Sequence, residues 1–492
     1  MNSTIKNTGQ VFTPKYLVNL ILDEIGYQGS GILKKHCIDN SCGNGALLSE
    51  IITRYIKAYK TMYGNVDDVV SDIRKYIHGI EIDPIVYNNC ISNLKSVCHD
   101  HNINCEQFDI LNCDTLSTSI FDGKMDFVVG NPPYVRVHNL DNSYKSVKTF
   151  SFANEGMTDL YLVFFEKGFR MLKEYGKLCY ITPGSWLNSV AGNVMRNYIR
   201  KNQNLISIID LEHFQAFNAT TYTIISLFEK GARNNTFAYN VFSPESLNKK
   251  YITSLSFNEV DINSCFYLSD HTALANLKQI LTAKVPKYAK VKNGFATLAD
   301  KIFVSSEFPF SELTIPIIKA STGKWYKAFY PYDQKGKPLS KETVFSIKSV
   351  SNYLNSHKQE LLKYKPEAKN PYWYLYGRTQ ALKDVYFNKL SINTTIKDIN
   401  SIKINFVSAG AGLYSGLYIT SIVGFDIIKQ IILTDNFINY IASPKKYKSG
   451  GYYTYNSKDL ESYLNYEIKK LIDYGKINIS SIEQCRFFKS NI

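Results

Sequence analysis

Residues 131–134, Asn-Pro-Pro-Tyr, follow an apolar run and place an amide and a phenol on either side of two prolines. Residues 127–130 before them predict the end of a buried strand. Proline fixes its backbone torsion and lacks a donor, so the Pro132 carbonyl can point into a site rather than into a strand ladder. The Asn131 amide oxygen is a second acceptor, and Tyr134 offers a flat face for stacking. The stretch predicts either a site for a flat, hydrogen-bond-donating ring or a strand-ending turn with a buried tyrosine.

Acidic residues also close three predicted strands upstream. Asp39 precedes a turn in which Gly43 and Gly45 lead into a helix, Glu81 follows in GIEIDP, and a third strand is expected to end at Asp109. A carboxylate at the carboxyl edge of a sheet can accept both hydroxyls of a ribose, and Asp109 would accept from an adenine amine. Three carboxylates would repel phosphates, which favours S-adenosylmethionine over NAD or ATP. The alternative is that each residue only caps a helix.

The elements that must position these residues alternate between short apolar strands and helical patterns over residues 1–235. This alternation predicts an α/β fold with a doubly wound, mostly parallel sheet. The expected strands lie in 36–45, 76–84, 103–111, 125–130, 177–186, 204–214 and 221–231, and the segment 160–176 is expected to be helical. Residues 135–157 lack periodicity and predict a long polar loop.

After residue 235 the alternation fades and shorter segments rich in Tyr, Lys and Gly follow. We therefore predict two domains, 1–235 and a mixed α+β domain at 236–492. Acidic and basic residues balance in the first, so the whole net charge of +14 belongs to the second. This asymmetry predicts a polyanion, such as nucleic acid, bound mainly by residues 236–492, although lysine-rich composition could also reflect genome bias.

Composition excludes several other classes. No apolar run reaches the length of a membrane span, and the N-terminus lacks the apolar core of a signal peptide. The nine cysteines are irregularly spaced, and neither they nor the eight histidines show the spacing of metal ligands. We expect a cytoplasmic protein with reduced cysteines, no membrane partner and no metal.

The ordered motifs resemble a known family. TGQVFTPKYLVNLIL, DNSCGNGALL, GIEIDP, FDIL and NPPY occur in the order seen in gamma-type adenine-specific DNA methyltransferases, the modification enzymes of bacterial restriction–modification systems. The motifs cover the first half of the chain; NGFATLADKIF, YWYLYGRTQAL and AGLYSGLYI are looser echoes in the second. The resemblance implies a class I S-adenosylmethionine-dependent methyltransferase fold over residues 1–235 and a DNA target-recognition domain over 236–492.

The resemblance also implies roles for particular residues. Asn131, Pro132 and Tyr134 would be catalytic, and Phe217, with Tyr222 as a possible substitute, would stack on the extruded target base. The residues that would contact the cofactor are Val11, Thr13, Asp39, Ser41, Gly43 and Gly45 at its methionine end, Glu81 at the ribose, and Asp109 with Ile110 at the adenine. Asn40 departs from the family pattern, which commonly has proline there.

The implied reaction is methyl transfer from S-adenosylmethionine to the 6-amino group of an adenine flipped out of double-stranded DNA. Methylation of RNA or of a protein glutamine and a non-catalytic DNA-specificity module are the alternatives. Arg378 is a candidate for base contact or for a core salt bridge, and residues 445–456 form either a DNA-facing loop or a plain hairpin. We expect a monomer. The sequence leaves open whether a separate cognate restriction endonuclease exists, and it implies no direct contact with one.

Overall fold

The computed structural model describes residues 13–137, 147, 149–217, 222–364 and 371–477, and the structural statements below concern these residues. The chain forms two compact units, Met1–Ala275 and Asn276–Ile492. No helix in the described part is long and apolar enough to cross a membrane.

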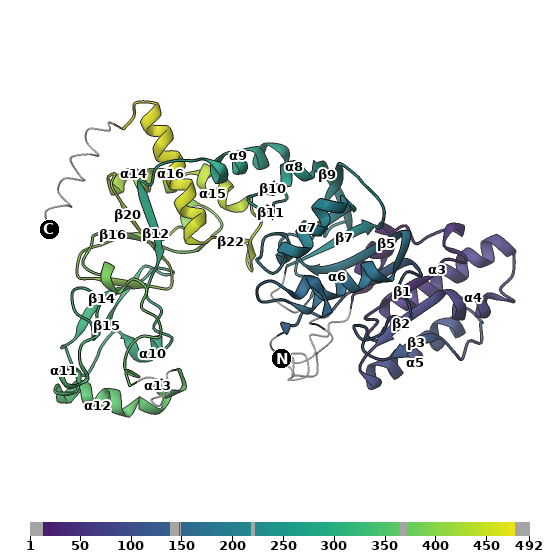
Figure 1. The fold of residues 1–492 in the computed structure, drawn as a ribbon, viewed down its shortest axis with the longest axis horizontal. Coiled ribbons are helices and arrows are strands. Elements are labelled where there is room, and N and C mark those ends of the chain that lie inside the picture. Colours follow the sequence, from purple (N-terminus) through teal and green to yellow (C-terminus); the bar gives the residue numbers. More distant parts are fainter. Residues whose placement is uncertain (1–12, 138–146, 148, 218–221, 365–370, 478–492) are drawn as a thin grey trace. The chain divides into compact units, whose positions relative to one another are not determined.

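The first unit is built on a nine-stranded sheet with the order β3-β2-β1-β4-β5-β7-β6-β8-β9 (Figure 1). All neighbours pair in parallel except β7, which is antiparallel to β5 and β6, and β9, which is antiparallel to β8. The strands are β1 (Cys37–Asp39), β2 (Ile77–Glu81), β3 (Asp109–Asn112), β4 (Met125–Gly130), β5 (Leu172–Pro183), β6 (Leu205–Asp210), β7 (Thr223–Glu229), β8 (Thr236–Ser243) and β9 (Asn248–Ser256). The predicted doubly wound, mostly parallel sheet is confirmed. The winding reverses between β1 and β4, and ligands bind at the carboxyl edge of such a reversal.

Two hydrophobic cores cover the two faces of this sheet. Successive strand residues alternate between them: Cys37 belongs to one core and Ile38 to the other, as do Val129 and Val128. This alternation follows from the two-residue period of a strand, and it makes both faces of the central strands apolar. The core with Cys37 includes residues of α2 (Lys15–Glu24), α3 (Ala46–Tyr63), α4 (Val69–Tyr76) and α5 (Pro84–Asp100). The core with Ile38 includes residues of α6 (Leu160–Met171), α7 (Asn193–Asn202) and α8 (Phe257–Val260).

The first unit extends beyond the predicted boundary at residue 235. β8 pairs in parallel with β6, and β9 completes a hairpin at the edge of the same sheet. A small ribbon of β10 (Asp261–Ile262) and β11 (Cys265–Phe266) follows, and α9 (His271–Thr282) spans the division between the units. The structural boundary therefore lies later than predicted, because strand pairing across the chain holds residues 236–256 in the first unit.

Helix α6 ends before the predicted position at Gly176. The chain already pairs with β4 at Leu172, opposite Met125. Gly176 passes so close to this strand that a Cβ there would lie 2.7 Å from the Met125 carbonyl oxygen. Strand pairing thus overrides a helical pattern that the local sequence continues for another turn.

The second unit is a mixed α+β structure, as predicted. One four-stranded sheet has the order β12-β20-β16-β18, another β13-β15-β14-β19, and a three-stranded sheet β17-β22-β21. The strands are β12 (Ala289–Asn293), β13 (Val304–Ser305), β14 (Thr314–Lys319), β15 (Lys324–Phe329), β16 (Lys389–Ile392), β17 (Thr395–Ile396), β18 (Ile404–Val407), β19 (Gly412–Tyr414), β20 (Leu417–Ser421), β21 (Tyr447–Lys448) and β22 (Tyr452–Thr454). The helices are α10 (Asp300–Phe303), α11 (Lys341–Phe345), α12 (Lys348–Ser356), α13 (Lys358–Tyr364), α14 (Phe425–Ile432), α15 (Asp435–Ala442) and α16 (Ser457–Asp473). Residues 445–456 contain the hairpin of β21 and β22.

Candidate active site

The Asn131 amide lies directly after β4 and is oriented by two hydrogen bonds. Its Nδ2 donates to Thr13 Oγ1 at 3.3 Å, and its Oδ1 accepts from the Tyr134 hydroxyl at 2.7 Å. The same hydroxyl also lies 3.1 Å from the Ile181 carbonyl oxygen. Asn131 is half-buried, so it lies neither in the apolar interior nor free in solvent. The structure thus brings Thr13, which the resemblance assigned to the methionine end of the cofactor, to the Asn-Pro-Pro-Tyr turn.

Aromatic side chains gather around the same turn. The Tyr134 ring lies 6.3 Å from the Phe217 ring at 71° and 6.4 Å from the Tyr161 ring at 82°. Tyr222 instead packs edge-on against His213. The structure thus brings Phe217, rather than Tyr222, to the predicted site. Because the Tyr134 and Phe217 rings are nearly perpendicular, a base that stacks flat on one would meet the other edge-on.

Asp39 and Glu81, the acidic residues that end β1 and β2, each accept hydrogen bonds from backbone N–H groups. Glu81 Oε2 accepts from the Gly43 N–H at 3.0 Å, and Oε1 accepts from the Asp83 N–H at 2.9 Å. Asp39 Oδ1 accepts from the Ser41 N–H at 3.1 Å. These bonds hold the glycine-rich turn against the end of β2, at the carboxyl edge where the winding reverses.

Burial changes the acidity of both carboxyl groups. Asp39 is fully enclosed, and burial raises its pKa to about 7, with the Ser41 N–H lowering it in part and nearby Glu81 raising it. Burial likewise raises the pKa of Glu81, against the opposing hydrogen bonds from Asp83 and Gly43. A carboxylate this short of partners is stabilised by a cationic or hydroxyl-bearing ligand.

The glycine turn leaves room for such a ligand. Gly43 has a φ of +55°, and no heavy atom lies within 4 Å of the place a Cβ would occupy. At Gly45, with a φ of +85°, a Cβ would lie 2.8 Å from Cys90 Sγ, so glycine is required for packing. The Ser41 hydroxyl is buried without a hydrogen-bond partner in the described structure. The open glycine, the orphaned hydroxyl and the buried carboxyls fit the methionine and ribose ends of S-adenosylmethionine.

Asp109 does not lie where the sequence predicted. β3 begins at Asp109 rather than ending there, and this residue pairs in register with His78. Its Oδ2 lies 2.5 Å from His78 Nδ1 at the amino end of both strands. Ile110 packs in the core beneath Gly79. The prediction that Asp109 ends the strand is wrong, because the pairing with β2 starts later than the apolar pattern suggested.

Asp114 is the acidic residue that follows the carboxyl end of β3. The register places Asn112 opposite Glu81, and Asp114 comes two residues further on. Asp114 Oδ1 accepts from the Leu116 N–H, and the Thr115 hydroxyl donates to the Asn40 carbonyl at 2.6 Å, which holds this turn against the end of β1. The fully buried Asn40, which stands where proline is usual in the family, is fixed by this contact. The aspartate three residues after FDIL was the available signal in the sequence.

The other predicted residues are distributed as follows. Val11 lies outside the described residues. Arg378 lies in the second unit and is exposed, and within the part of the chain that the structure describes it forms no ion pair. The core salt bridge considered for Arg378 is therefore contradicted.

Two exposed apolar side chains border the Asn-Pro-Pro-Tyr turn. The segment that carries Met157 pairs with residues directly after Tyr134, through Val137 N–H to the Thr158 carbonyl at 2.9 Å. Met157 is 66% exposed and Val190 is 71% exposed. Val190 lies beside Gly156, where a Cβ would be 3.3 Å from its side chain. We call this pair the apolar rim.

Comparison with known protein families gives a match for this region. Residues 53–217 match the model of the Eco57I restriction-modification methylase. The match covers about a third of the chain. The match runs from α3 through the Asn-Pro-Pro-Tyr turn to Phe217, and so contains Glu81, Asn131 and Tyr134 of the site described above.

Curated relatives of the methylase family extend the likeness over most of the chain. This chain is 24% identical over 482 residues to the type II restriction enzyme and methyltransferase RM.Eco57I of Escherichia coli, and the alignment covers 84% of this chain and 45% of that protein. It is also 24% identical to the type II methyltransferase M.AccI of Acinetobacter calcoaceticus, covering 78% of this chain and 75% of that protein. The chain thus spans less than half of the first relative and three quarters of the second.

One solved structure aligns with most of this chain. The type IIL restriction-modification enzyme MmeI, solved in complex with DNA, aligns with 93% of this chain and 68% of its own at a TM-score of 0.65 and 13% identity. At this identity the likeness establishes the fold. The predicted class of fold is therefore confirmed over nearly the whole chain.

Proposed function

We propose that this chain is a DNA methyltransferase that transfers a methyl group from S-adenosylmethionine to the 6-amino group of an adenine flipped out of duplex DNA. The observation that carries the proposal is the Asn131 amide, held between Thr13 and Tyr134 at the carboxyl end of β4. Across the reversal of the sheet lie the glycine turn, Asp39 and Glu81. The match of residues 53–217 to a methylase model supports the same reaction.

The cofactor would lie along the ends of β1, β2 and β3. S-adenosylmethionine, when bound, supplies an electrophilic methyl group. Asp39 and Ser41 would hold its methionine end, the Glu81 carboxylate its ribose hydroxyls, and Asp114 the amine of its adenine. Each oxygen of Glu81 already accepts one backbone hydrogen bond and retains a lone pair for a hydroxyl.

Asn131 and Pro132 would prepare the target amine. The lone pair of an adenine amine is delocalised into the ring, which makes the nitrogen a poor nucleophile. The Asn131 Oδ1 oxygen would accept one amino hydrogen while the Pro132 carbonyl accepts the other. These two acceptors draw the nitrogen towards tetrahedral geometry and stabilise the positive charge that develops on it. The proton leaves after transfer, so the proposal needs no general base.

The target base would stack in the aromatic cluster. Extruding a base from the duplex costs a few kcal/mol, which stacking of about 1–3 kcal/mol per base offsets. Tyr134 or Phe217 supplies the flat face, and the apolar rim lies where the duplex would approach. The match of residues 53–217 to a methylase model and the positive net charge of residues 236–492 support double-stranded DNA, rather than RNA or a protein, as the proposed substrate.

The test is single-molecule sequencing of DNA from cells that express this chain and otherwise lack adenine methylation. Methyladenine in a fixed sequence context is expected with the native chain and is expected to vanish with Asn131→Ala. The exposed Asn65→Ala should leave the methylation pattern unchanged and controls for expression. Full methylation in the Asn131→Ala cells would remove the role given to this amide. Absence of methyladenine with the native chain would contradict the proposed substrate.

A further inference from the structure

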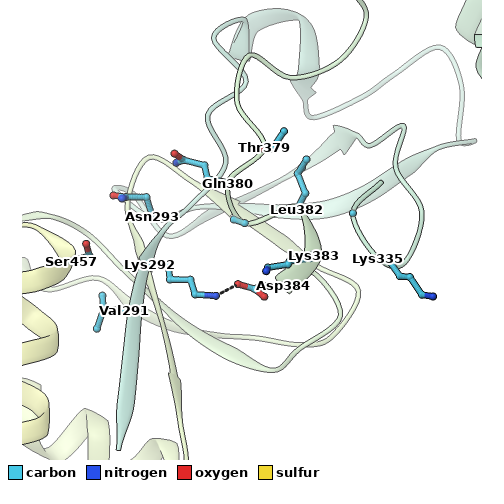
Figure 2. Close-up of a pocket in the computed structure, with 12 residues that line it drawn as sticks. Val291, Lys292, Asn293, Lys335, Thr379, Gln380, Leu382, Lys383, Asp384 and Ser457 are labelled. Atoms are coloured by element: carbon cyan, nitrogen blue, oxygen red, sulfur yellow. Dashed lines mark hydrogen bonds and ion pairs between the residues drawn. The ribbon is translucent and has the colours of Figure 1, made fainter. Parts of the chain in front are cut away.

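A polar pocket in the second unit has no part in the site described above. It has a volume of about 430 Å³ and lies between β12, the loop around Gly336 and the segment 379–384 (Figure 2). Its charged lining residues are Lys292, Lys335, Lys383 and Asp384, and its uncharged polar ones include Asn293 and Thr379. We propose that this pocket binds the phosphodiester backbone of the DNA duplex, with Lys335 and Lys383 contacting phosphates.

The charges of the lining favour an anion. Asp384 is the single carboxylate, and its Oδ2 pairs with Lys292 at 2.6 Å and accepts from the Tyr418 hydroxyl at 2.6 Å. Figure 2 shows Lys292 and Lys383 beside Asp384. Lys335 and Lys383 are exposed, and neither forms an ion pair among the residues that the structure describes. With three lysines against one aspartate, the lining still carries a net charge of +2.

The segment that carries Lys383 is held rigidly from beneath. The buried Lys389 ammonium donates to the carbonyl oxygens of Asp384 at 2.8 Å, Val385 at 3.1 Å and Phe387 at 3.0 Å. The Tyr330 hydroxyl donates to the Leu382 carbonyl at 2.7 Å. A buried ammonium that satisfies three carbonyls fixes the turn, so Lys383 needs little ordering when an anion binds.

The loop that carries Lys335 packs backbone to backbone on the same segment. Gly336 has a φ of +72°, and a Cβ there would lie 2.6 Å from the backbone nitrogen of Lys383. On the other side, Gln380 Nε2 donates to the Gly294 carbonyl at 2.6 Å, and the Arg378 N–H donates to the Ala296 carbonyl at 3.1 Å. Three segments distant in sequence are thus packed around one cationic pocket. The exposed Arg378 immediately precedes the segment 379–384 in the chain.

The ligand chemistry is that of a phosphate ester, and DNA is the favoured source. The whole net charge of the chain lies in the half that contains the pocket, which suits a polyanion better than a small ion. Lysines act on phosphates as point charges and carry no sequence information. The pocket would therefore orient the duplex rather than read bases. This inference rests on the proposed DNA-directed function.

The experiment measures duplex binding by the full chain as a function of salt, using fluorescence anisotropy and any duplex of about 30 base pairs, since phosphate contacts are independent of sequence. The variant is Lys335→Gln with Lys383→Gln. The control is Lys324→Gln with Lys348→Gln, which removes the same charge from exposed lysines outside the pocket. The pocket variant should bind more weakly and lower the slope of log affinity against log salt by about one unit per lysine.

The outcomes separate the two proposals. If the native chain binds no duplex at any salt concentration, the proposed function fails and the pocket assignment with it. If the native chain binds duplex and the pocket variant matches the control in affinity and slope, only the pocket assignment is overturned. Adenosine monophosphate serves as a probe for a free nucleotide: loss of its binding in the pocket variant with unchanged duplex binding would overturn DNA as the occupant.

Discussion

The most consequential single residue outside the Asn-Pro-Pro-Tyr turn is Asp39. Its carboxyl group is enclosed at the end of β1, and burial raises its pKa to about 7. In the unfolded chain the same group would ionise near its usual value, so folding must carry the free-energy cost of burying a charge at higher pH. Such a cost is retained where a ligand requires the charge, which is a trade of stability for function.

We predict that Asp39→Asn stabilises the ligand-free chain at pH 8. The folded pKa is raised, so the native chain should lose stability as pH rises from about 4 to about 7 and then level off. The variant lacks this loss, and its advantage should reach on the order of 4 kcal/mol at pH 8 and disappear near pH 4. Urea denaturation across this pH range measures it. A stability advantage of the variant that does not change with pH would contradict the burial of a charged Asp39. Calorimetry should also show that the variant binds S-adenosylmethionine more weakly than the native chain.

At the scale of elements, the segment after the Asn-Pro-Pro-Tyr turn is tied to the start of α6. Arg136 and Asp159 form an isolated bridge, and Leu160 N–H donates to the Val135 carbonyl at 2.8 Å, so the start of α6 is tied to the catalytic turn. These bonds hold Met157, one of the two residues of the apolar rim, close in the chain to the segment that pairs with residues after Tyr134. Exposed apolar side chains beside a base-binding pocket are suited to pack against or between base pairs.

We predict that Met157→Ser lowers kcat/KM for duplex DNA by about tenfold, since burying a methionine side chain contributes about 1.5–3 kcal/mol. The affinity for S-adenosylmethionine and the melting temperature should stay unchanged, because the side chain is exposed in the free chain. Met62→Ser is the matched control, at a methionine that is 61% exposed in α3. Equal kinetics of the two variants would show that the rim does not touch DNA.

At the scale of the whole molecule, the two units differ in the sites they contain and in net charge. The first holds the sheet and the candidate active site, and the second holds the net positive charge and the cationic pocket. The boundary between the units lies after the last strand of the extended sheet. It does not lie where the strand–helix alternation in the sequence ends. β8 and β9 cover what would otherwise be the exposed edge of β6. An uncovered edge presents unpaired backbone groups and invites aggregation.

We predict different behaviour from two truncations. A chain ending at Thr282, the last residue of α9, should fold and bind S-adenosylmethionine while losing most of its affinity for duplex DNA. A chain ending at Asn235, the boundary suggested by the sequence, should aggregate or melt at lower temperature because β6 loses its partner. Thermal denaturation, calorimetry and anisotropy measure the three properties. Equal melting temperatures for the two chains would contradict the structural role of β8 and β9.

The sequence by itself determined the features that depend on neighbouring residues. The Asn-Pro-Pro-Tyr turn, the glycine turn after Asp39 and the helix that follows it lie where predicted, because proline, glycine and short-range periodicity set backbone geometry locally. Most helices and strands of the first unit were predictable for the same reason. Even the pairing of Phe217 with Tyr134 was expected, although only through the family resemblance.

Only the tertiary structure decided which end of a strand each residue occupies and what lies across from it. The register of β3 on β2 puts Asp109 at the amino end of β3, and Asp114 follows the carboxyl end of that strand. Pairing of β8 with β6 moved the domain boundary, and packing of three distant segments created the pocket around Lys383. Register and packing depend on contacts between residues far apart in the chain, and the two-residue alternation of a strand is unchanged when the strand slips by two residues.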